Sequence, residues 1–191
     1  MKRRGLIVLD RDGVLNRMVW RSAAEPVDSP LFAQEVEILP GVPETLRRLM
    51  DAGFTLNIAS NQPAYAKGKV SLEDLKATHA RVISLVQSAG ARIQQSYICF
   101  HRAEDGCDCR KPRTGLLEAA LRGFPEGSPS TSWMVGDRAV DVIAGATLGF
   151  STALLGLSTA AEDERLAQAG VQPSFRGPDL TGFANFLLGE A

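Results

Sequence analysis

Leu6-Ile7-Val8-Leu9-Asp10-Arg11-Asp12-Gly13, residues 6–13, is an apolar run that ends in two aspartates and a glycine. Uninterrupted apolar runs are typical of strands buried on both faces, so residues 5–10 are predicted to form a strand of a parallel sheet. Residues two apart on an extended chain point the same way, which lets Asp10 and Asp12 converge on one ligand. Two close carboxylates favour a cation between them or a proton on one of them. This pair therefore indicates a metal-assisted nucleophile with an acid/base partner, although an acidic turn is the plain alternative.

The rest of the chain alternates between short apolar runs and amphipathic stretches. This pattern predicts a Rossmann-like, three-layer α/β sandwich with a mostly parallel sheet and helices on both faces. The predicted strands are residues 54–60, 93–99, 132–135 and 152–155. The predicted helices are residues 43–52, 71–89, 112–121, a segment from about 138, and 183–188.

Length and charge restrict the class of protein. With 191 residues, we expect a single domain over residues 1–191, and a monomer. The net charge of −1 offers no basic excess, so a nucleic-acid partner is not expected. Residues 142–161 are 20 uncharged residues, the length of a bilayer span, but their glycines and hydroxyl residues favour a helix end, a turn and a strand. No membrane partner and a cytoplasmic location are expected.

Polar residues follow three other predicted strands, at the sheet edge where α/β proteins bind ligands. Ser60-Asn61-Gln62 offers a hydroxyl and two amides, and Asp137 and Asp141 form a second carboxylate pair. Each has a plain alternative, a strand-to-loop transition or a helix N-cap.

Arg110-Lys111-Pro112 lies between these two motifs. If Pro112 begins a helix, two cations crowd its positive end, and an anionic ligand there would compensate for them.

All three cysteines of the chain and one of its two histidines fall within residues 99–109. The spacing of Cys99, His101, Cys107 and Cys109 suits a tetrahedral zinc site, and we predict a zinc-binding loop there. A disulfide would leave one cysteine over, and a catalytic cysteine is less favoured beside a carboxylate nucleophile. The other histidine, His79, is predicted to be solvated.

Together these motifs resemble the four motifs of the haloacid dehalogenase superfamily of phosphatases. The resemblance rests on Asp10-x-Asp12-Gly, Ser60-Asn-Gln, Arg110-Lys111-Pro and Gly136-Asp137-x-x-x-Asp141. It runs from Leu6 to about Gly149, and the zinc loop is similar to that of the heptose-1,7-bisphosphate and histidinol-phosphate phosphatase subfamily.

The resemblance implies a two-step phosphoryl transfer. Asp10 would attack phosphorus to form an aspartyl-phosphate, while Asp12 protonates the leaving oxygen and later deprotonates water. It implies Mg²⁺ held by Asp10, by Asp12 through its main-chain carbonyl, and by Asp137.

The resemblance also implies the phosphate-binding residues. Ser60, Asn61, Arg110 and Lys111 would bind the phosphate. Asp141 would support the site by holding metal-bound water or by orienting Lys111.

The spacing between the motifs leaves no room for a cap domain, so we expect a capless phosphatase with an open site. The segment of residues 17–37 and the zinc loop would then provide specificity, and Trp20, Arg21 and Glu25 are candidates to contact substrate. The expected substrate is a small phosphorylated sugar of the heptose bisphosphate type, or alternatively histidinol phosphate or another small phosphomonoester. A polynucleotide 3′-phosphatase and a non-catalytic, zinc-stabilised binding module are the rival hypotheses.

Overall fold

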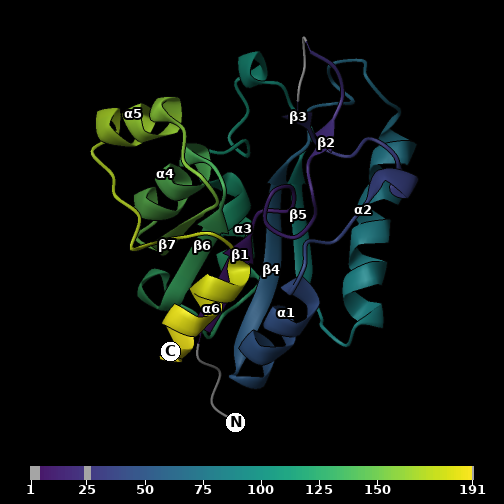
Figure 1. The fold of residues 1–191 in the computed structure, drawn as a ribbon. Coiled ribbons are helices and arrows are strands. Elements are labelled where there is room, and N and C mark those ends of the chain that lie inside the picture. The colour runs from purple at the N-terminus through teal and green to yellow at the C-terminus, as the bar shows by residue number, and fades with distance from the viewer. Residues whose placement is uncertain (1–4, 24–26, 191) are drawn as a thin grey trace.

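The computed structural model describes residues 5–23 and 27–190 (Figure 1). Its elements are, in chain order, β1 (Gly5–Leu9), β2 (Val19–Trp20), β3 (Val27–Asp28), η1 (Ala33–Glu35), α1 (Val42–Asp51), β4 (Phe54–Asn61), α2 (Leu72–Ser88), β5 (Gln95–Cys99), η2 (Ala103–Asp105), α3 (Gly115–Arg122), η3 (Pro129–Thr131), β6 (Ser132–Gly136), α4 (Ala139–Thr147), β7 (Ser151–Leu155), α5 (Ala160–Gln168), β8 (Phe175–Gly177) and α6 (Leu180–Leu188).

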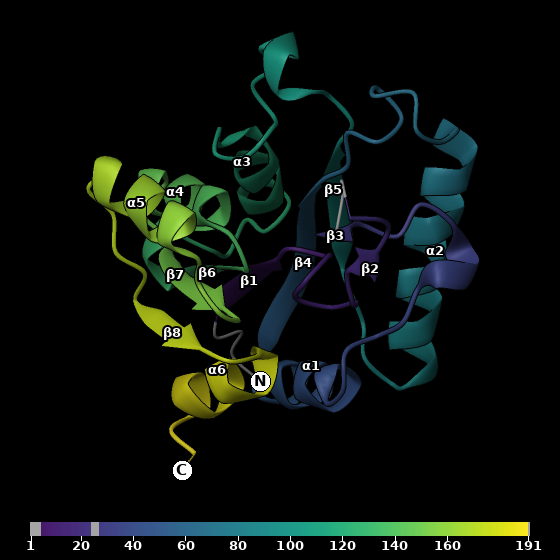
Figure 2. The same ribbon diagram turned by 45° about the horizontal axis from the view of Figure 1, so that its top comes forward.

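β1 lies inside a six-stranded sheet of order β5-β4-β1-β6-β7-β8, in which every neighbouring pair is parallel. Its side chains alternate between two cores. Ile7 and Leu9 pack with residues of α1 and α6, whereas Leu6 and Val8 pack with residues of α3 and α4. Figure 2 shows these two helix pairs on opposite sides of the sheet. The predicted three-layer α/β sandwich is therefore confirmed.

Between β1 and α1, the described residues contain only the two-stranded β2-β3 hairpin and the single turn η1 as regular structure. These small elements form no separate layer, which agrees with the expectation of a capless enzyme. No described helix combines the length and the apolar character that crossing a bilayer requires. The uncharged residues 142–161 instead span most of α4, a turn and all of β7.

One predicted helix begins at a different residue. The prediction placed its start at Pro112, but α3 begins at Gly115. Residues 110–113 instead form a turn, in which the Arg113 N–H donates to the Arg110 carbonyl. Within this turn, the N–H and the carbonyl of Lys111 are both hydrogen-bonded to the Asn61 side chain. The argument that two cations crowd a helix start at Pro112 is therefore wrong, and the basic pair must be explained by its contacts.

Candidate active site

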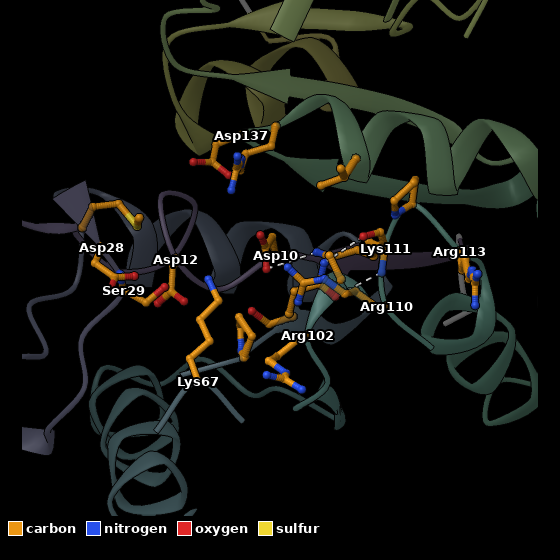
Figure 3. Close-up of a pocket in the computed structure, with 18 of the residues that line it drawn as sticks. Asp10, Asp12, Asp28, Ser29, Lys67, Arg102, Arg110, Lys111, Arg113 and Asp137 are labelled. Carbon is orange, nitrogen blue, oxygen red and sulfur yellow. Dashed lines mark hydrogen bonds and ion pairs between the residues drawn. The ribbon is translucent and has the colours of Figure 1, made fainter. Parts of the chain in front are cut away.

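The polar strand ends meet at one edge of the sheet, in a cleft with a volume of about 490 Å³ (Figure 3). Residues of β4, of the loops after β1 and β6, of the loop after β5 and of the β3 end line it. Its basic lining residues outnumber its acidic ones by seven to four. The seven are Lys67, Arg102, Arg110, Lys111, Arg113, Arg138 and Arg165. A chain of net charge −1 thus concentrates positive charge at this cleft, as an anionic ligand requires.

Lys111 lies at the floor of the cleft, between two carboxylates. Its Nζ is 3.2 Å from Asp10 Oδ1 and 2.5 Å from Asp141 Oδ1, and it donates to the Ala59 carbonyl at 2.6 Å. Burial opposes the charge of Lys111, but Asp10 and Asp141 hold the pKa of its ammonium above the usual value. The fully buried Asp141 therefore has a geometry suited to orienting Lys111, the second of the two supporting roles considered for it.

Asp137 completes a group of three carboxylates. Single oxygens of Asp10, Asp137 and Asp141 lie within 4.8 Å of one another. Burial, followed by the charges of Asp10 and Asp141, raises the pKa of Asp137 to about 8, and its buried Oδ1 has no hydrogen-bond partner among the described residues. An unpartnered oxygen in an acidic cluster fits a hard divalent cation such as Mg²⁺, which prefers oxygen ligands.

Gly13 allows this approach. Its φ is +80°, and a Cβ there would lie 2.2 Å from Asp137 Oδ2. The glycine after the aspartate pair therefore does more than turn the chain: it leaves space for a carboxylate from another strand.

Asp12 is buried but does not belong to the carboxylate group. Arg11 donates to both of its oxygens, from Nε to Oδ1 and from Nη2 to Oδ2, each at 3.0 Å. Asn16 Nδ2 donates to Oδ1 at 2.9 Å and Gln62 Nε2 donates to Oδ2 at 2.5 Å. Burial alone would raise the pKa of Asp12, but the charge of Arg11 and these hydrogen bonds hold it below its ordinary value. In this arrangement the carboxylate is ionised, the form that accepts a proton from water.

Ser60 and Asn61 end β4 beside this group, and both line the cleft. Ser60 Oγ accepts a hydrogen bond from Gln62 Nε2 at 3.0 Å, which leaves its proton free for a ligand. Asn61 Nδ2 donates to the Lys111 carbonyl and its Oδ1 accepts from the Lys111 N–H. Both polar atoms of the Asn61 side chain are therefore bonded to the Lys111 backbone, which suits Asn61 to holding Lys111 in place.

The three cysteines and His101 come together as the spacing predicts. The Cys109 Sγ lies 3.2 Å from Cys99 Sγ, 3.5 Å from Cys107 Sγ and 3.3 Å from His101 Nδ1. Burial and the neighbouring thiols raise the pKa of Cys99 to about 12. Tetrahedral zinc with Zn–S bonds of about 2.3 Å places two sulfurs ~3.8 Å apart, whereas a disulfide bond is about 2.05 Å. Three sulfurs and one nitrogen in this arrangement fit a structural zinc ion.

The expected specificity segment contributes to the cleft through residues other than those predicted. Val27 and Asp28 line the cleft, whereas Arg21 is bonded to Glu35 and to the Ser29 carbonyl. Trp20 pairs with Val27 across the hairpin and is 69% exposed. Glu25, also predicted to contact substrate, lies outside the described residues.

Arg110 lines the cleft beside the zinc loop, where it donates to the His101 carbonyl at 3.0 Å. This contact links Arg110 to the loop that holds the thiols.

His79 differs from its prediction. It is partly buried, in a second cavity of about 410 Å³ that Arg11, Gln62 and Phe100 also line. Burial, followed by the charge of Arg11, lowers the pKa of His79 to about 4. The prediction that it is merely solvated is wrong, because residues distant in sequence, among them Arg11, Gln62 and Ile98 of β5, line the cavity beside it.

Comparisons with known proteins place this geometry in a family. The HAD-hydrolase-like family matches residues 108–182. The D-glycero-beta-D-manno-heptose-1,7-bisphosphate 7-phosphatase of Pseudomonas putida is 33% identical over 187 residues, which cover 96% of this chain and 99% of that protein. The chain belongs to the HAD-like phosphatases. It is therefore a phosphoric monoester hydrolase, from a family that uses Mg²⁺.

Solved structures agree with this assignment. The D,D-heptose 1,7-bisphosphate phosphatase of B. bronchiseptica, determined with magnesium and phosphate, superposes with a TM-score of 0.80 at 32% identity, over 98% of this chain and 99% of that one. The chain is also similar to a second group of proteins, which belong to histidine biosynthesis. The histidine biosynthesis bifunctional protein HisB of Legionella pneumophila is 34% identical over 137 residues, 71% of this chain and 37% of that protein.

Proposed function

We propose that this HAD-like phosphatase hydrolyses a small sugar phosphate of the heptose 1,7-bisphosphate type, with Asp10 as nucleophile and Asp12 as general acid and base. The observation that carries the proposal is the convergence of Asp10, Ser60 and Lys111 at the floor of a basic cleft. The substrate class comes from the relatives in Pseudomonas and B. bronchiseptica, which match this chain almost end to end.

In the first step, an Asp10 oxygen forms a bond to phosphorus as the ester P–O bond breaks. Asp12 gives its proton to the departing oxygen, which leaves as the sugar alcohol. Because the resting Asp12 is ionised, it must first take up a proton, and an approaching phosphate dianion favours this by raising its pKa. In the second step, water attacks the aspartyl-phosphate, its proton passes to Asp12, and phosphate and free Asp10 are released.

Lys111 and Ser60 bind the equatorial phosphate oxygens in this proposal, with Asn61 and Asp141 holding Lys111 in place. Arg110 would bind the substrate at the cleft wall. Mg²⁺ would be held by Asp10, Asp137 and the main-chain carbonyl of Asp12, and when bound it offsets the repulsion between Asp10 and the phosphate.

Zinc would be held by Cys99, His101, Cys107 and Cys109 in the loop that carries Arg110. We propose further that residues 1–191 form one phosphatase domain, and that the enzyme is a cytoplasmic monomer with a small-molecule substrate.

The test is phosphate release in Mg²⁺ from a panel of heptose 1,7-bisphosphate, histidinol phosphate, other sugar phosphates and a 3′-phosphorylated oligonucleotide. We expect the heptose bisphosphate to give the highest kcat/KM and Asp10→Asn to release none of it. Asp51→Asn serves as the matched control, because Asp51 ends α1 just before the start of β4, at the opposite end of that strand from Ser60. Undiminished release by Asp10→Asn would overturn the mechanism, and a higher kcat/KM for histidinol phosphate would favour the HisB-like substrate.

A further inference from the structure

Gln62 is a buried amide to which the proposed phosphatase mechanism assigns no role. It follows β4 directly, it is 2% exposed, and its N–H donates to the Cys99 carbonyl at 2.7 Å. This main-chain bond holds Gln62 between β4 and the end of β5, with its side chain facing the loop that carries Asp12.

Both ends of the Gln62 amide have partners in the site. Its Nε2 donates to Asp12 Oδ2 at 2.5 Å and to Ser60 Oγ at 3.0 Å. Its Oε1 accepts from Arg11 Nη2 at 2.8 Å. One side chain therefore connects the proposed acid/base, the proposed phosphate-binding hydroxyl and the guanidinium that pairs with the acid/base.

A short carboxylate side chain does not fix its own direction, because it turns about two bonds. Around Asp12, Arg11 and Asn16 come from the same loop, four residues or fewer away, and move with it. Gln62, which follows β4 and is 50 residues away in the chain, is the donor to Asp12 from outside this loop among the described residues. It therefore fixes the Asp12 carboxylate relative to Ser60, and so relative to a phosphate bound there.

From these contacts we infer that Gln62 is a positioning residue, which aligns Asp12 for proton transfer to the leaving oxygen and shares in placing Ser60. The inference rests on the proposed function, because it requires Asp12 to be the proton donor. If so, loss of the amide should lower kcat/KM most for substrates whose leaving group needs that proton.

The experiment compares two leaving groups. The sugar alkoxide of heptose 1,7-bisphosphate is strongly basic and needs a proton, whereas p-nitrophenolate is weakly basic and leaves without one. The measured quantity is kcat/KM, which reports only the steps up to release of the leaving group and so excludes the later attack by water. Asp12→Asn sets the scale, since general acid catalysis contributes about 10²–10⁴-fold.

Gln62→Met keeps the length of the side chain and removes both polar atoms. We expect its kcat/KM for heptose 1,7-bisphosphate to fall by about 10²-fold. We also expect this loss to exceed its loss on p-nitrophenyl phosphate by roughly tenfold or more, in the same sense as Asp12→Asn. Gln62→Leu is shorter and also lacks both polar atoms, and it adds no charge beside Asp12. It should show the same selective loss, which keeps the test available if the Met variant does not fold.

Asn57→Leu is the matched control, a buried amide in β4, the strand that Gln62 follows, whose Oδ1 accepts from the Gln95 N–H away from the cleft. It should affect both substrates equally. Equal losses on both substrates in the two Gln62 variants, with a selective loss in Asp12→Asn, would overturn the inference and leave the proposed function standing. If Asp12→Asn itself loses both substrates equally, the acid role of Asp12 fails, and the inference fails with it.

Discussion

Replacing Lys111 with methionine tests the charge arrangement at the floor of the cleft. The substitution keeps the length of the side chain but removes a buried ammonium that pairs with both Asp10 and Asp141. Breaking a buried ion pair by removing one partner costs about 3–5 kcal/mol. For a chain of this size that corresponds to a fall in Tm of roughly 10 °C.

Magnesium should recover part of this loss. In Lys111→Met, single oxygens of three carboxylates remain within 4.8 Å without the lysine. At an effective dielectric constant of about 20, two unit charges at that separation repel by ~3 kcal/mol, and a divalent cation removes the repulsion. We therefore expect Mg²⁺ to raise the Tm of the variant by about 5 °C more than it raises that of the wild type.

The assay is calorimetry of dialysed protein with and without added Mg²⁺, alongside phosphate release. Phosphate release by Lys111→Met should fall by about 10²–10³-fold, the range seen when one donor to a transition-state oxyanion is removed. Arg81→Met, at an exposed position of α2 that lines neither the cleft nor the second cavity, is the control and should change neither quantity. A Tm for Lys111→Met equal to that of the control, or an Mg²⁺ shift no larger than in wild type, would refute the reasoning.

Two further perturbations address the zinc loop and the second cavity. Treatment with 1,10-phenanthroline, which removes zinc, should raise KM for heptose 1,7-bisphosphate by about tenfold. The reason is that the thiols then no longer hold the loop whose His101 carbonyl accepts from Arg110. An unchanged KM in protein shown by metal analysis to be zinc-free would contradict this. His79→Gln should lessen the acid sensitivity of folding: the native pKa of about 4 lies below the unfolded value of 6.5, so only the unfolded state takes up a proton between them and stability falls as pH drops. Between pH 7.5 and 5.5, urea unfolding should show about 1 kcal/mol less destabilisation in His79→Gln than in wild type, and an equal loss would argue against a buried neutral His79.

The cleft could be anticipated from sequence because its geometry follows from the strands. Parallel strands bring their carboxyl ends to one edge, so Asp10, Ser60 and Asp137 meet once the apolar runs before them are recognised as strands. The thiol cluster was predictable for a different reason. Cys99, His101, Cys107 and Cys109 are close in sequence, so a short loop suffices to bring them together.

What sequence did not reveal depends on contacts between distant residues. Pro112 has the appearance of a first helical residue, but Asn61, 50 residues before Lys111, pairs with the Lys111 main chain and delays α3 to Gly115. The environment of His79 likewise depends on residues far from it in sequence, because Arg11, Gln62 and residues of β5 line its cavity. By contrast, α5 was overlooked although Thr159 caps it by accepting from the Glu162 N–H, a local signal that can be read in the sequence.

The buried charges of the site account for the kind of ion it should hold. Four carboxylates, those of Asp10, Asp12, Asp137 and Asp141, lie against two buried cations, Arg11 and Lys111. Arg11 pairs with Asp12, and Lys111 lies between Asp10 and Asp141, so two negative charges remain and Asp137 has no ion pair among the described residues. A divalent cation balances that remainder and a monovalent one does not. Because the pKa of Asp137 is about 8 while the cluster holds no cation, an ion that binds there must also displace its proton. The charge count therefore favours a divalent cation, and it follows from how Arg11 and Lys111 pair with the carboxylates.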